Sequence, residues 1–145
     1  MTDFNEIENS CLSLNTIRND FIFLHVNSYG LSFLTAHELF EEYYKHLQDD
    51  IDTVLEIYAG LNKDTDSVAV VPFSLNRSSG SFIKMQDLDS EQNVFDTAQK
   101  LAAKVVDCLE NVRESLTSNG YLSMIDDMLG YWEKQARFIA MRFCV

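Results

Sequence analysis

Residues 31–61 read LSFLTAHELFEEYYKHLQDDIDTVLEIYAGL, and this stretch decides the fold. Its apolar residues recur every three or four positions, which is the period of one face of an α-helix. The stripe consists of Ala36, Phe40, Tyr43, Leu47, Ile51, Val54 and Tyr58. We therefore predict a long amphipathic helix that follows the turn-forming segment 27–30 and ends near Leu61.

The same period predicts three more helices. They cover about residues 4–27, 90–117 and 121–143. Asp3 suits the N-cap of the first helix, and Gly120 suits the C-terminal cap of the third. With one proline and five glycines in 145 residues, long helices are easy to build.

Residues 62–90 separate the second and third predicted helices and show no sustained helical period. Pro72 and several Asp, Asn, Ser and Gly residues predict a loop there. So long a connection fits a four-helix bundle with a crossover between its second and third helices. We predict an all-α, ferritin-like bundle that forms a single domain over residues 1–145, with a short helix at 81–87 inside the crossover.

Composition narrows the class of protein. Apolar residues make up 46% of the chain, and 11 Lys and Arg are scattered among 23 Asp and Glu, which gives a net charge of −12. This surface repels phosphate and attracts cations, so we expect no direct DNA binding. No apolar run is long enough for a membrane helix, and the first ten residues contain no basic residue, unlike a signal peptide. Three widely spaced cysteines suit reduced thiols in a cytoplasmic protein.

Two pairs of metal-ligating residue types lie on the long helix. His37 and Glu41 are four positions apart, and so are Asp52 and Glu56, so each pair shares one face of the helix. The first members of the pairs are 15 residues apart, which is about 22 Å along a helix, and lie about 60° apart around it. One chain cannot close both pairs around one ion. Two antiparallel copies related by a twofold axis can, and that would give two equivalent sites.

With His25, the set contains two imidazoles and three carboxylates, which suit iron, zinc or manganese. Taken singly, each carboxylate fits a solvated helix face, His37 fits a contact near a helix start, and His25 fits a hydrogen-bonded interior position. The joint spacing favours a metal site. His46 matches no ligand position, and we expect it at the surface.

The ligand region resembles the signature of the Dps mini-ferritins. The resemblance rests on residues 25–42, HVNSYGLSFLTAHELFEE, and on residues 52–56, DTVLE, with a weaker match at residues 133–136, EKQA. It implies that His25, His37 and Glu41 of one chain and Asp52 and Glu56 of its neighbour form a ferroxidase site across a twofold interface. It further implies that Fe²⁺ is oxidised by hydrogen peroxide in preference to dioxygen. The Fe³⁺ is then stored in a homododecameric shell, which protects against oxidative stress.

The chain departs from the family pattern at several positions. Val26 and Arg137 stand where the family usually has tryptophans that border the iron site. Tyr121 and Ser123 replace acidic residues that line the family's entry pores, and Asp126 and Asp127, about a turn further on, are candidates to substitute for them. The lysine-rich tail by which many members hold DNA is missing from both ends.

Two function classes follow from these observations. The first is an iron-sequestering ferroxidase, and the second is a Dps-like cage that serves as a scaffold, binder or DNA-protecting protein with weak or lost oxidase activity. A di-iron enzyme with its site inside one bundle normally carries Glu-x-x-His pairs. No Glu is followed three residues later by His in this chain, so we set that class aside.

Overall fold

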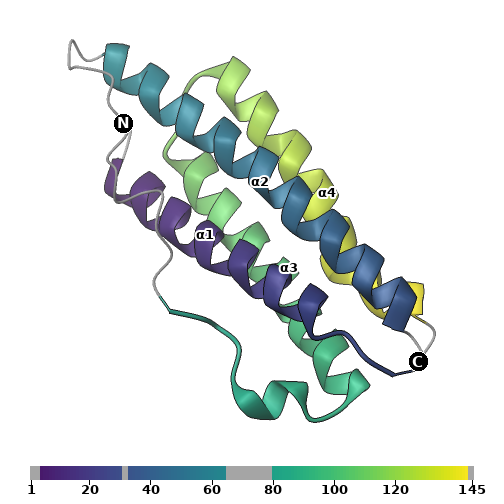
Figure 1. The fold of residues 1–145 in the computed structure, drawn as a ribbon. Coiled ribbons are helices and arrows are strands. Elements are labelled where there is room, and N and C mark those ends of the chain that lie inside the picture. The colour runs from purple at the N-terminus through teal and green to yellow at the C-terminus, as the bar shows by residue number, and fades with distance from the viewer. Residues whose placement is uncertain (1–3, 31–32, 65–79, 144–145) are drawn as a thin grey trace.

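In a computed structural model, the chain is an all-helical bundle (Figure 1). The structure describes residues 4–30, 33–64 and 80–143, without the side chains of 62–64, 138 and 140–143. The helices are α1 (Phe4–Val26), α2 (Phe33–Asp64), α3 (Glu91–Glu114) and α4 (Asn119–Phe143), and a short 3-10 turn, η2, covers Met85–Leu88. The predicted all-α bundle is confirmed for these residues.

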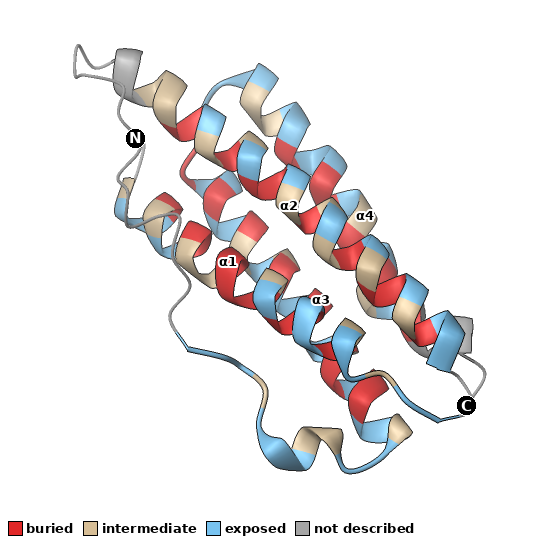
Figure 2. Cartoon of the chain, in the orientation of Figure 1, coloured by how far each residue is buried: buried red, intermediate tan, exposed pale blue. Residues whose placement is uncertain are grey.

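The helices pack mainly as two antiparallel pairs. α1 lies against α2, α3 lies against α4, and α1 also contacts α3 along the bundle. Figure 2 shows that the buried residues occupy the facing sides of the helices. The predicted stripe of α2 is buried, with every member at most 5% exposed. Within the described ranges, no helix combines the length and apolarity that are needed to cross a bilayer.

The helix boundaries differ from the predicted ones at three places. α3 ends at Glu114, where the backbone N–H of Ser115 bonds back to the Val112 carbonyl. Gly120 is therefore not a C-terminal cap. It lies in the first turn of α4, and its backbone does not adopt positive φ. The predicted helix at 81–87 is reduced to η2, and the predicted N-cap Asp3 lies outside the described residues.

The turn between α1 and α2 needs glycine at position 30. Gly30 has φ of 88°, in the left-handed region that other residues avoid. A Cβ atom there would also lie 2.0 Å from a carboxylate oxygen of Glu91. The hydroxyl of Tyr29 donates to the Leu88 carbonyl at 3.1 Å and so joins this turn to η2. The turn places the end of α1 beside the start of α2.

Asp20 anchors the segment before η2 to α1. This carboxylate is only 4% exposed and accepts hydrogen bonds from the Ser81 hydroxyl at 2.5 Å and from the Phe82 backbone N–H at 2.9 Å. A buried carboxylate requires such partners, because burial without hydrogen bonds is costly. The chain that leads into α3 is therefore held against the middle of the bundle.

A polar cluster joins α2 to α4. The Asp50 carboxylate, 6% exposed, accepts from Trp132 Nε1 at 2.7 Å and contacts His46 Nδ1 at 3.1 Å. The His46 ring stacks on Tyr131, with centroids 3.6 Å apart. Trp132 is fully buried, as expected of a packing residue. The His46 side chain is 36% exposed, so the expected surface position is met, and its ring also packs on Tyr131 of α4.

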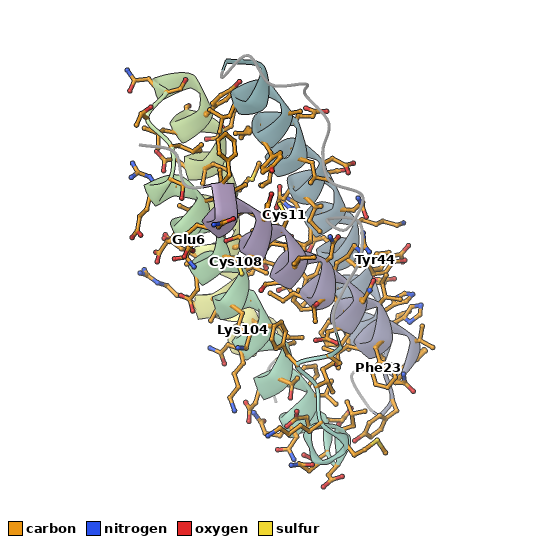
Figure 3. All side chains as sticks on the ribbon, turned by 90° about the vertical axis from the view of Figure 1, so that its left-hand side faces the viewer. Glu6, Cys11, Phe23, Tyr44, Lys104 and Cys108 are labelled. Carbon is orange, nitrogen blue, oxygen red and sulfur yellow. The ribbon has the colours of Figure 1, made fainter. Side chains whose placement is uncertain are left out.

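Two cysteines lie between α1 and α3. Cys11 is buried, Cys108 is half-buried, and both are free thiols (Figure 3). Burial raises the pKa of Cys11 to about 12, helped by neighbouring Cys108 and Glu8. Burial and nearby Asp107 raise the pKa of Cys108 to about 11. Both thiols stay protonated at neutral pH.

We expect Asp20→Ala to lower the free energy of unfolding by about 2 kcal/mol, because it leaves two donors without their acceptor. Urea denaturation of the purified protein measures this change. Asp89→Ala, at an exposed position of the same segment, is the control and should stay within about 0.5 kcal/mol of the wild type. Equal stability of the two variants would contradict the anchoring role of Asp20.

The His46–Asp50 contact should make stability depend on pH. The hydrogen bond to Asp50 is the main reason that the pKa of His46 is raised above its ordinary value, with the charges of Asp50, Asp49 and Glu42 adding to it and burial opposing it. A raised folded-state pKa stabilises the protein below the unfolded-state pKa of about 6.5, and this contribution is lost as pH rises through the folded-state pKa.

Urea denaturation at about pH 5.5 and pH 8 checks this expectation. The wild type should lose more stability over that interval than His46→Gln, which cannot gain a charge. If the two proteins lost the same amount, protonation of His46 would not contribute to stability.

Candidate functional site

The structure brings His25 and His37 into direct contact. His25 lies in the last turn of α1 and His37 in the first turns of α2. Their rings stack with centroids 3.7 Å apart and planes 24° apart. His25 Nδ1 lies 2.8 Å from the His37 carbonyl oxygen, and His37 Nδ1 lies 3.0 Å from the His25 carbonyl oxygen. The His25 carbonyl belongs to the last turn of α1, which lacks partners within its own helix, so this contact also caps the helix.

These two hydrogen bonds decide which ring nitrogen can bind a metal. A carbonyl oxygen only accepts, so each Nδ1 must carry the proton. In a neutral ring, Nε2 is then unprotonated and has a lone pair available. Metal-ligating histidines commonly use the other ring N–H in this way to fix ring position and tautomer. Both histidines are therefore prepared as Nε2 ligands.

The stacking limits how the two rings can bind. A nitrogen lone pair lies in the plane of its ring, and two nearly parallel planes 3.7 Å apart do not meet at one nearby ion. The two histidines can ligate two separate ions, or one ring must rotate to share an ion with the other. Accordingly, the described residues of a single chain contain no group of three or more His, Cys, Asp or Glu that is arranged to hold a metal.

Glu41 lies one helical turn beyond His37 and is half-exposed. Its Oε1 atom accepts from Lys45 Nζ at 2.5 Å. This hydrogen bond is the main reason that the pKa of Glu41 is lowered, with the Lys45 charge second and smaller contributions from His25 and His37. The carboxylate is thus close enough to both histidines to interact with them. Three of the five predicted ligands gather at this end of α2.

Asp52 and Glu56 do not join that group. Both are exposed and lie further along α2, and Asp52 Oδ1 accepts from Gln48 Nε2 at 3.0 Å. The separation of about 22 Å along the helix is too long for one ion to bridge. That the five residues bind metal stays a prediction, and a second chain is needed to bring them together.

The surface around the histidines is unusually apolar for an exposed face. Val26 is 70% exposed, Leu34 is 63% exposed, and Phe23 and Phe33 are each 45% exposed. The Phe33 ring also stacks on His37 at 5.4 Å. Figure 3 shows Phe23 near the C-terminal end of α1. Clustered exposed apolar side chains often mark interaction surfaces.

A separate groove is lined by residues of α1 and α2. Its volume is about 530 Å³, and it is lined by Arg18, Ile22, Tyr44, Lys45, Gln48 and Asp49. The rings of Tyr44 and His25 lie edge to face, with centroids 5.4 Å apart. The groove is therefore connected to His25 through Tyr44 and to Asp52 through Gln48.

Sequence reasoning missed Lys45 and Gln48, the two residues that hold predicted ligands. Both could have been found, because Lys45 follows Glu41 by four positions and Gln48 precedes Asp52 by four, which is the spacing of paired side chains on a helix. They were overlooked because neither is a metal-ligating residue type.

Comparisons with models of known protein families, with curated proteins and with solved structures find no match to this chain.

Proposed function

We propose that this protein is an iron-sequestering mini-ferritin of the Dps type, which oxidises Fe²⁺ at a site shared between two subunits and stores the Fe³⁺. The observation that carries the proposal is the division of the ligands. His25, His37 and Glu41 gather at one end of α2, and Asp52 and Glu56 lie exposed further along it. The first group contains one carboxylate, Glu41, and the second group can supply two more from another chain.

A twofold axis that crosses α2 between His46 and Leu47 completes the arrangement. With two antiparallel copies of α2, that axis sets His37 opposite Glu56 and Glu41 opposite Asp52. The exposed apolar side chains beside the histidines supply a surface for this contact. The same symmetry produces two sites, one at each end of the interface.

The remaining ferritin-like features belong to the same proposal. α2 and α3 run in the same direction in Figure 1, which supports the proposed crossover between them. Assembly into a dodecamer, a cytoplasmic location and storage of ferric mineral are proposed from the sequence resemblance. The net charge of −12 favours attraction of Fe²⁺ and disfavours direct DNA binding.

The chemistry requires little more than placing iron beside an oxidant. Fe²⁺ is the substrate, and the imidazole and carboxylate ligands suit it. One hydrogen peroxide takes one electron from each of two Fe²⁺ ions and, with two protons, becomes two water molecules. The protein's part is to hold two ions close together, and the stacked histidines can bind separate ions without losing their hydrogen bonds to the backbone.

A cage with weak or lost oxidase activity is the second candidate function. The contact that favours it is the ion pair between Glu41 and Lys45, which occupies a predicted ligand with a protein cation. Val26 also favours this function, because it stands where the family usually has a tryptophan that borders the iron site. A protein of this kind would assemble normally and leave iron uptake unchanged when the ligands are substituted.

We expect His25→Ala and Asp52→Ala each to lower anaerobic Fe²⁺ binding and peroxide-driven growth of ferric absorbance by at least about tenfold. The physical reason is that each substitution removes a side chain that would bind the iron directly. Glu110→Ala, an exposed acid on α3, is the control and should behave like the wild type. Unchanged iron oxidation in both ligand variants would favour the second candidate function.

Mixing the two variants tests whether the site is shared. When His25→Ala and Asp52→Ala chains are unfolded together and refolded, a mixed pair has one doubly defective site and one intact site. Random pairing should therefore restore about a quarter of the wild-type sites. Restoration fails if all five ligands act within one chain.

A further inference from the structure

Glu41 is paired with a cation of the protein itself. Its carboxylate and the Lys45 ammonium form an ion pair at 2.5 Å across one turn of α2. Lys45 is 65% exposed at its side chain, so its ammonium is not trapped by packing and can move away. A divalent ion that binds Glu41 has to compete with it, because both interact with the same carboxylate.

In the twofold arrangement proposed above, Lys45 serves two carboxylates. The axis between His46 and Leu47 sets Glu41 opposite Asp52 of the second copy and Lys45 opposite Gln48 of the second copy. Without a cation nearby, the two facing carboxylates would repel each other. Within each chain, Lys45 bonds to Glu41 and Gln48 bonds to Asp52. In the paired arrangement, Lys45 of one copy and Gln48 of the other therefore hold the two facing carboxylates.

Lys45 also has a second carboxylate within reach. Asp49 lies one turn beyond it on α2, as Glu41 lies one turn before it, and side chains four positions apart can pair on a helix. Lys45 and Asp49 both line the groove of about 530 Å³, which gives the side chain room to swing. The Lys45 ammonium can therefore pair either with Glu41, which is a predicted ligand, or with Asp49, which is not.

We propose that Lys45 is a counter-ion placeholder for the iron site: it neutralises Glu41 while the site is empty, and entry of Fe²⁺ moves its ammonium from Glu41 to Asp49. This inference rests on the proposed function and adds a residue that sets metal affinity without touching the metal. It explains how acidic ligands from two chains face each other before iron arrives. It also makes the site selective for cations that outcompete an ammonium group.

Calorimetric titration of the full-length protein with Co²⁺, which peroxide chemistry does not complicate, tests the proposal. Lys45→Met removes the competing charge and keeps much of the side-chain shape, so it should bind Co²⁺ about fivefold more tightly than the wild type. Lys45→Arg keeps the charge and should bind like the wild type. Lys100→Met removes one charge from the exposed side of α3 and is the matched control for net charge.

The transfer to Asp49 has its own test. Asp49→Ala removes the second place for the ammonium and should weaken Co²⁺ binding by about twofold. In the Lys45→Met background the same substitution should have a smaller effect, because no ammonium remains to be moved. Equal effects of Asp49→Ala in both backgrounds would refute the transfer.

Displacement can also be followed in the wild-type protein, where no variant can fail to assemble. The Lys45 amine should react faster with an acylating reagent once Co²⁺ is added, because it moves from the half-exposed Glu41 to the exposed Asp49 and so gains access to solvent, whereas Lys100 should not change. Peptide mass spectrometry measures both rates. An unchanged rate at Lys45, or a Lys45→Met affinity no tighter than that of the wild type, overturns the placeholder role.

Failure of this inference differs from failure of the proposed function. If His25→Ala abolishes Co²⁺ binding and Lys45→Met leaves it unchanged, the shared site stands and the placeholder role falls. If His25→Ala and Asp52→Ala both leave Co²⁺ binding intact, the shared site itself falls, and the placeholder role falls with it.

Discussion

The pair of hydrogen bonds between the rings of His25 and His37 and each other's carbonyl groups is the contact on which the site depends. It joins the last turn of α1 to the first turns of α2 and fixes where the two imidazoles stand. By placing the protons on Nδ1, it also leaves Nε2 of both rings available to a metal. Glu41 follows one turn later, so the position of the first three predicted ligands is set by a single local contact.

α2 carries three polar pairs at a spacing of four residues, and they serve two different faces. Glu41–Lys45 and Gln48–Asp52 lie along the side that carries the predicted ligands, whereas His46–Asp50 turns toward α4 and the buried Trp132. Such pairs add little stability where they are exposed. Their value on the side of the predicted ligands is positional, because they hold the Glu41 and Asp52 carboxylates in place.

The helices could be predicted from the sequence because their apolar period is a local property, and the buried stripe of α2 follows it closely. Helix ends were harder to predict. Gly120 offered a plausible cap, but Ser115 ends α3 earlier and buried Leu116 takes the chain into the core. The contact of His46 with Tyr131 could not be predicted, because α4 is remote in sequence from α2. The histidine contact depends on how α1 and α2 meet at Gly30, and spacing alone does not reveal that geometry.

The two free thiols bear on how the proposed peroxide chemistry would affect the protein itself. Oxidation of a cysteine by peroxide proceeds through the thiolate, and burial keeps Cys11 and Cys108 in the protonated form. Sulfur in the interior is therefore a poor target for an oxidant that reaches the outside of the bundle. α1 and α3 are therefore held together by packing and not by a disulfide between Cys11 and Cys108, and these thiols would stay reduced under the proposed iron oxidation.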